Sequence, residues 1–265
     1  MTVDWLHVAA GALTGFVVGL TGVGGGALMT PILLLAFGMA PHTAIGTDLW
    51  FAAITKLAVA RLHQTQGLID WSVLRRLLLG SLSASILTLA WIHRQPIDAG
   101  SVALLRGAIA AAVCLTAVGL LVQKPLQAMA RRVYSVSNDE AVGDRTLLTV
   151  IAGAMLGCLV TLTSVGAGAL GVVFLVYLYP TRLTPRRLIA TDIAHAIPLA
   201  IVAGLGHLMI SNVDLPLLGG LLLGSIPAAL AGARLSSTLS HGWLRLALAT
   251  VLLVVGVKLG ADVWR

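Results

Sequence analysis

The chain has 265 residues, of which 58% are hydrophobic and only 10% are charged. Soluble globular domains carry about 25% charged residues, so this composition excludes an ordinary soluble fold. The formal charge of +7 does not indicate a nucleic-acid partner, because Lys and Arg stand singly or in pairs between apolar runs instead of gathering on one basic surface. The composition predicts a protein that crosses a membrane many times.

Apolar runs follow one another along most of the chain. A membrane-spanning helix needs about 20 apolar residues. Two runs, the second with Pro31 in it and the seventh ending near Tyr179, are too short to cross a bilayer comfortably. We therefore expect an all-α polytopic membrane protein of about ten segments, with short broken helices near the midplane. The predicted segments are 5–22, 26–38, 43–61, 73–92, 102–122, 146–164, 168–180, 187–209, 213–233 and 243–261.

One long polar stretch, from Gln123 to Arg145, interrupts this series. It contains the charged and turn-prone sequence Ser135–Glu140. Clusters of Ser, Asn and Asp between apolar segments are typical of loops. The chain is therefore predicted to consist of a transmembrane half at 1–122, a connecting loop at 123–145 and a second transmembrane half at 146–265.

The two halves repeat one another in sequence. Gly15–Leu28 and Gly157–Leu170 are identical at nine of fourteen positions, at an offset of 142 residues. Matching motifs then continue in the same order, which indicates an internal duplication. At an offset of 144 the matches are Thr47–Asp48 with Thr191–Asp192, His63 with His207, Asp70 with Asp214 and Leu77–Ser81 with Leu221–Ser225.

The number of segments predicts how the two halves are oriented. Each half holds five segments, and an odd number of crossings makes the second half an inverted copy of the first. Cytoplasmic loops carry an excess of Lys and Arg. With ten alternating crossings, one side receives twelve of these residues, and the side with both chain ends receives three. We therefore expect both ends outside the cell and the 123–145 loop in the cytoplasm.

Each half has a cluster of small residues directly before its short segment, at Gly22–Gly26 and at Ser164–Gly168. A helix break inside a membrane is tolerated where the backbone lines a polar cavity. A helix that starts at such a break points free N–H groups and its positive dipole end at the cavity. Short glycine-interrupted segments at matching places in two repeats indicate a transporter's binding site. The alternative is that these glycines serve close helix packing.

The expected substrate-binding residues surround these two breaks. Most of them would offer backbone N–H groups or hydroxyl groups. Lys56, in the third segment, would either offer positive charge to an anion or extend toward the membrane surface. The set is Thr21, Gly22, Gly24, Gly25, Gly26, Thr47, Lys56, Thr163, Ser164, Gly166, Gly168 and Thr191.

Ionisable residues inside apolar runs are the candidates for proton coupling. Asp48 and Asp192 are paired by the repeat, and a carboxylate in the membrane interior is costly and usually functional. An Asp early in a segment can equally cap a helix. His63 and His207, also paired, and the unpaired His195 could titrate near neutral pH. For the paired histidines, hydrogen bonding near the membrane surface is the alternative.

Asp70 and Asp214 each directly precede an apolar segment. Asp is favoured at the position before the first turn of a helix, so both residues are predicted to cap the helices that follow them.

The order of motifs along the chain carries a resemblance to a known family. The motifs are Gly22–Gly26 with Pro31, Gly46–Asp48, His63, Gly67, Asp70–Trp71 and Gly80–Ser81, and a second copy at Ser164–Gly168, Thr191–Asp192, His207, Asp214 and Gly224–Ser225. This series, which covers essentially the whole chain, resembles the sulfite exporter TauE/SafE family of permeases, also called the TSUP family. Many members of that family have serine where Asp48 and Asp192 stand.

The resemblance implies a transporter in the bacterial inner membrane. Its substrate would be a small sulfur-containing or organic anion such as sulfite, sulfoacetate or another sulfonate. From the paired breaks and carboxylates we expect alternating access, with protons as coupling ion. Besides the anion, protons and membrane lipid, a second copy of the chain is left open as a partner, and nucleic acid is not expected. We expect no cofactor, no metal ion and no enzymatic activity.

Two alternative functions remain at this stage. One is an anion channel. The other is an intramembrane hydrolase in which Ser164 is the nucleophile and His195 or His207 is its base. No Gly-x-Ser-x-Gly sequence surrounds Ser164, which counts against the hydrolase.

Overall fold

The computed structural model describes residues 4–21, 26–64, 67–96, 98–136, 145–235 and 241–263. Within these residues the chain forms ten α-helices and no β-strand, which confirms the all-helical prediction. In chain order they are α1 (Trp5–Thr21), α2 (Gly26–Leu35), α3 (Pro41–Gln64), α4 (Trp71–Arg94), α5 (Ala99–Val136), α6 (Thr146–Thr163), α7 (Ala169–Leu178), α8 (Pro185–Met209), α9 (Leu215–Leu235) and α10 (His241–Val263).

Seven of the described helices, α3, α4, α5, α6, α8, α9 and α10, are long and apolar enough to cross a membrane. Helix α1 has 17 residues, whereas α2 and α7 have only 10 each. A ten-residue helix is about 15 Å long, half the thickness of the hydrocarbon core. The expected short second and seventh segments are therefore present. The inverted arrangement of the two halves stays a prediction.

The connecting loop is the part of the predicted organisation that the structure corrects. Helix α5 continues through Pro125 to Val136, so the prediction of a loop is wrong for residues 123–136. The apolar part of α5 ends at Gln123. The residues that follow are rich in Gln, Lys, Ala, Met and Arg, which form helices well in water. These polar residues therefore extend the helix beyond its apolar part. Residues 137–144 lie outside the described part of the chain.

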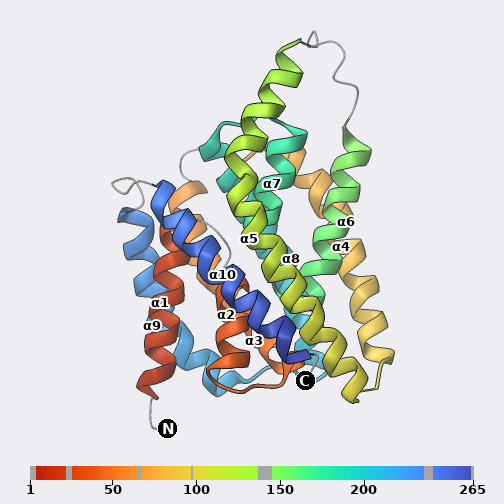
Figure 1. Cartoon of the computed structure of the whole chain (residues 1–265), viewed down its shortest axis with the longest axis vertical. Helices are drawn as coiled ribbons and strands as arrows, with labels where there is room; N and C mark the ends of the chain where they lie inside the picture. The colour runs from red at the N-terminus through yellow and green to blue at the C-terminus, as the bar shows by residue number, and fades with distance from the viewer. Residues whose placement is uncertain are drawn as a thin grey trace.

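Helices from the two halves pack against each other in pairs, α1 against α9 and α4 against α6 (Figure 1). In the first pair, a Cβ atom at Gly15 would collide with the backbone of Ser225. In the second pair, a Cβ atom at Gly157 would overlap the carbonyl oxygen of Ser81. These glycines let the helix backbones touch, as small residues do between membrane helices. The two contacts join residues that correspond under the repeat offsets of 142 and 144.

Helices α3 and α8 form the centre of the molecule. They are the most deeply buried of the seven long helices, and they pack against each other. The indole N–H of Trp50 donates to the carbonyl oxygen of Gly204 at 3.0 Å and fixes one helix to the other. Apart from Asp70, every buried Asp, Lys or His side chain among the described residues lies on these two helices, so the fold places these side chains inside the protein, away from lipid.

Candidate functional site

The break between α6 and α7 is fully described. Ser164 ends α6 with a φ of 58°, and Gly166 and Gly168 have φ values of 118° and 126°. Glycine adopts such positive φ values without the penalty that a side chain brings. The Val165 N–H donates to the hydroxyl of Thr163 at 3.1 Å, which holds the turn in place. The helix is therefore interrupted at Ser164–Gly168, as predicted.

The start of α2 lies directly against this break. A Cβ atom at Gly26 would overlap the carbonyl oxygen of Ser164, so the two backbones touch with no side chain between them. Figure 1 shows α2 in the lower half of the view and α7 in the upper half. The first residue of α2, in the first half of the chain, thus meets the break that precedes α7, in the second half. Of the predicted first cluster, Gly22, Gly24 and Gly25 lie outside the described residues.

Asp48 lies beside this meeting point and is fully buried. It is the eighth residue of α3, so the structure excludes the alternative that it caps the helix. The Thr30 hydroxyl of α2 donates a hydrogen bond to Asp48 Oδ2, and it lies 3.5 Å from the carbonyl oxygen of Thr163. Asp48 Oδ1 has no hydrogen-bond partner among the described residues. The Ser164 hydroxyl lies near this carboxylate, outside hydrogen-bond geometry.

Asp192 occupies the corresponding place on α8 and is only 1% exposed. Helix α8 is capped by Thr184, so Asp192 is not its cap either. Within the described chain, neither carboxylate oxygen of Asp192 has a hydrogen-bond partner. Its Oδ1 lies against the backbone of α7, where a Cβ atom at Gly171 would overlap it. The backbone amide of Gly168 is near, but not in hydrogen-bond geometry.

Lys56 is buried between the two carboxylates and is 2% exposed. Its ammonium group donates to the carbonyl oxygen of Ala167, within the α6–α7 break, at 3.0 Å. It interacts electrostatically with Asp192 and Asp48, without an ion pair closer than 4.0 Å among these described residues. The alternative that Lys56 extends toward the membrane surface is wrong. Its positive charge is held at the break.

His195 and His207 form their hydrogen bonds with residues outside the break. His195 is buried on α8, and its Nε2 is 2.9 Å from the hydroxyl of Ser81. His207 Nε2 is 3.0 Å from the carbonyl oxygen of Thr161. Neither described imidazole forms a hydrogen bond with Ser164, whose hydroxyl has no partner in the described residues. The side chain of His63 lies outside the described residues.

Thr47 and Thr191 join the two halves through reciprocal hydrogen bonds. The backbone N–H of Asp214 donates to the Thr47 hydroxyl at 3.0 Å, and the backbone N–H of Asp70 donates to the Thr191 hydroxyl at 3.1 Å. Each threonine directly precedes a buried carboxylate of the site. Their hydroxyl groups therefore hold α3 and α8 at the loops of the opposite half.

Thr21, the last residue of α1, donates its hydroxyl to the carbonyl oxygen of Val17 at 2.7 Å, within its own helix.

Asp70 and Asp214 accept hydrogen bonds from the backbone N–H groups of Val73 and Leu217, at 3.2 and 3.0 Å. Their predicted role as helix caps is confirmed.

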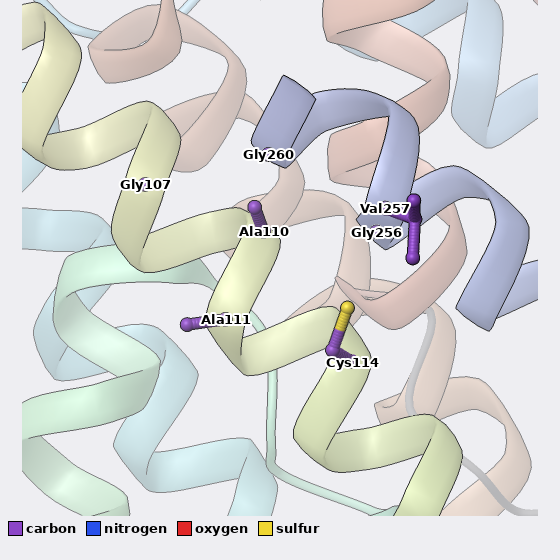
Figure 2. A pocket seen from close by; sticks show the side chains of 7 residues that line it. All are labelled: Gly107, Ala110, Ala111, Cys114, Gly256, Val257 and Gly260. Carbon is purple, nitrogen blue, oxygen red and sulfur yellow. The ribbon is translucent and has the colours of Figure 1, made fainter. Parts of the chain in front are cut away.

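A cavity of about 380 Å³ lies elsewhere, between α5 and α10 (Figure 2). Among the described residues that line it, none carries a charge, and Cys114 contributes a thiol. Such a lining offers nothing that would hold an anion or a proton. The polar cluster at the helix break is therefore the candidate site. The cavity is lined by Gly107, Ala110, Ala111, Cys114, Gly256, Val257 and Gly260.

Comparison with models of known protein families identifies the family of this chain. The model described as "Sulfite exporter TauE/SafE" matches residues 7–259. The chain belongs to this family. The resemblance inferred from the order of the motifs is thereby confirmed, and the protein is a multi-pass membrane transporter of the TauE/SafE type.

Curated relatives of this TauE/SafE protein carry transporter names. It is 34% identical to the "Probable membrane transporter protein YjnA" of Bacillus subtilis over 257 residues, which cover 95% of this chain and 98% of the relative. It is 26% identical to the "Probable membrane transporter protein YdhB" of the same organism, over 93% of this chain and 96% of the relative. No solved structure matches the chain significantly.

Two residues of this TauE/SafE site are missing from the sequence-based set. Thr30 is the hydroxyl donor to Asp48, and Gly171 is the residue against which Asp192 packs. Thr30 could have been noticed as a polar residue in a short apolar segment. Gly171 gives no such signal, because its importance depends on which helix faces it.

Proposed function

We propose that this TauE/SafE protein carries a small sulfur-containing or organic anion, such as sulfite, sulfoacetate or another sulfonate, across the bacterial inner membrane by alternating access. The observation that carries the proposal is the contact of Gly26 with Ser164. There the start of one half-length helix meets the break that precedes the other, beside three buried ionisable side chains. Short helices that begin at matching breaks in two repeats are typical of transporter binding sites.

The meeting point has the features that an anion site in a membrane requires. Helix α2 begins there and α7 begins at the far end of the break, and a helix start presents N–H groups and a partial positive charge. Lys56 adds a full positive charge that is shielded from water and lipid. The Ser164 hydroxyl adds a buried donor without a partner in the described residues. Together these groups favour an anion that accepts several hydrogen bonds.

Because the site contains two carboxylates, the proton is the proposed coupling ion. With Asp48 and Asp192 ionised and Lys56 protonated, the cluster has a net charge of −1, which would repel an anion. Buried charges interact strongly because water does not screen them. Protonation of one carboxylate makes the cluster neutral, so an anion and a proton are proposed to bind together.

The paired contacts support the proposed inverted arrangement of the two halves. The reciprocal bonds of Thr47 and Thr191 and the glycine contacts of α1 with α9 and α4 with α6 follow the repeat offsets. Such correspondence is expected of a duplicated fold with a pseudo-twofold axis. In this arrangement, one half rocks against the other to open the site to either side. Both chain ends are proposed to lie outside the cell, because the Lys and Arg residues would then lie mainly in the cytoplasm.

Transport by the purified protein tests the proposal. The protein is reconstituted in liposomes, and uptake of sulfite, sulfoacetate and taurine is measured with and without a pH gradient. We expect uptake of at least one anion that saturates with concentration and is accelerated by the same anion on the opposite side. Uptake that does not saturate and ignores the opposite side would instead identify an anion channel. Absence of all flux would refute anion transport.

A further inference from the structure

The two carboxylates that the repeat pairs do not have equivalent surroundings. Asp48 accepts a hydrogen bond from the Thr30 hydroxyl. The residue that corresponds to Thr30 at the offset of 142 is Val172, which has no hydroxyl to donate. Both oxygens of Asp192 are accordingly without a hydrogen-bond partner in the described residues. Of the two carboxylates, Asp48 alone has a side-chain hydrogen-bond donor among the described residues, and this donor stabilises its ionised form.

Lys56 is shared by the two carboxylates. Its repeat counterpart is the apolar residue Ala200, so one lysine serves two aspartates. It interacts electrostatically with both Asp192 and Asp48. Asp192, which lacks a hydrogen-bond donor, thus depends most on Lys56 for any stabilisation of its negative charge.

The other elements around Asp192 offer little to replace Lys56. Helix α7 presents the bare backbone at Gly171, which lets the carboxylate approach closely and offers it no side-chain donor. Helix α8 contributes His195, whose Nε2 faces Ser81. Helix α3 contributes Lys56 and the like charge of Asp48. The start of α4 contributes Asp70, which is paired with Arg182 and touches Thr191 through its backbone.

We propose that Asp192 is the residue that carries the coupled proton, and that its protonation releases Lys56 to pair with the transported anion. This inference rests on the proposed function. When Asp192 is ionised, its charge and that of Lys56 offset each other. An arriving anion then gains little electrostatic stabilisation from Lys56. When Asp192 is protonated, Lys56 loses this partner and the cluster of Lys56, Asp192 and the ionised Asp48 is neutral instead of negative, so an anion can approach Lys56 in a medium that screens charge weakly. The anion and the Asp192 carboxylate therefore compete for one lysine, and Asp48 remains bound to Thr30.

The charge balance defines how many protons move. One proton enters on Asp192 for each anion that binds beside Lys56, and both leave together on the other side. A monovalent anion and its proton then cross without moving net charge. A divalent anion moves with one proton and one net negative charge. The expected ratio is one proton per anion in either case.

The test uses proteoliposomes whose membrane potential is held at zero by potassium and valinomycin. Uptake of labelled sulfoacetate, or of another anion from the transport screen if sulfoacetate is not moved, is followed under a pH gradient. The wild-type protein is expected to accumulate the anion on the alkaline side. Asp192→Asn is expected to lose accumulation but to retain anion exchange at a reduced rate. Asp48→Asn is the matched control and is expected to be slower while still responding to the pH gradient.

The outcomes separate this inference from the proposed function. Accumulation by Asp192→Asn in response to the pH gradient would overturn the proton-carrying role. Loss of the response in Asp48→Asn alone would assign that role to Asp48 instead. If Asp192→Asn does not fold, the test is the number of protons that the wild-type protein moves per anion. This number is measured with a pH-sensitive dye inside the liposomes. About one proton per anion supports the inference, and none overturns it. If the wild-type protein moves no anion at all, the proposed function itself fails.

Discussion

Arg182 holds the carboxylate of Asp70 by two hydrogen bonds, from Nε to Oδ2 at 3.0 Å and from Nη2 to Oδ1 at 2.9 Å. Arg182 lies between α7 and α8, and Asp70 directly precedes α4. Asp70 is 6% exposed and Arg182 is 45% exposed. A bidentate pair of this kind fixes both distance and orientation. It therefore joins the turn after one short helix to the first half of the chain.

The first prediction concerns the pH dependence of this pair. Burial disfavours the ionised form of Asp70, but the Val73 N–H and the Arg182 guanidinium outweigh it and hold the pKa of Asp70 below its ordinary value. Because the folded-state pKa is the lower one, the stabilisation is complete above the ordinary pKa of about 4. It is lost as the pH falls through the folded-state pKa.

Arg182→Gln is therefore expected to lower the stability at pH 7 by up to about 1 kcal/mol, a small value because Arg182 is nearly half exposed. In detergent, its melting temperature should fall below that of the wild-type protein at pH 7, and the difference should shrink near pH 3. Arg186→Gln, at an exposed neighbour, is the control. Equal losses in both variants would contradict a specific role for the pair.

The second prediction concerns the hydroxyl that binds Asp48. Thr30→Val keeps the shape of the side chain but removes the donor, so a buried carboxylate loses its hydrogen bond. The expected loss of stability is about 1 to 3 kcal/mol, measured by unfolding in detergent. Thr116→Val is a matched control, because the buried hydroxyl of Thr116 has no hydrogen-bond partner in the described chain. An equal loss in the control would show that the Thr30 bond contributes nothing specific.

The third prediction concerns the buried cation. Lys56→Gln removes the positive charge at the helix break, so we expect the KM for the transported anion to rise at least about tenfold, the effect of losing one charged hydrogen bond. Transport by proteoliposomes is the measurement. Lys258→Gln, at an exposed position on α10, is expected to leave KM unchanged. A normal KM in Lys56→Gln would remove Lys56 from the site.

The fourth prediction concerns the contact of α4 with α6. Gly157→Ala places a Cβ atom on the carbonyl oxygen of Ser81, so the two helices must move apart. Overpacking of this kind costs about 1 to 3 kcal/mol. Gly219→Ala is the control, since no described atom outside its own helix lies within 4 Å of the added Cβ. The melting temperature should fall for Gly157→Ala and stay constant or rise for Gly219→Ala.

The sequence was sufficient to predict the features that depend on local composition. Apolar runs located the helices, and the glycines at Gly166 and Gly168 located the break, because a positive φ calls for glycine. Asp70 and Asp214 were recognised as caps because each directly precedes an apolar segment. These predictions need no knowledge of which helices are neighbours.

Features that depend on tertiary packing could not be predicted. Lys56 was left between two roles because its burial depends on the helices around α3. Asp48 and Asp192 were left between site and cap because the exact starts of α3 and α8 decide the question. The helical continuation of α5 to Val136 was missed because its polar composition suits both a loop and a helix in water.

The bare backbone contact of Gly26 with Ser164 is expected to limit how quickly the molecule can work. No side chain separates the two backbones, so a change of rotamer, which takes picoseconds to nanoseconds, cannot open the contact. In the proposed alternating access, a solute passes only when whole helices separate and close again, and collective motions of this kind take microseconds to milliseconds. The transport rate of each molecule is thus expected to be set by the movement of its helices. This rate should lie far below the rate of ion flow through an open pore.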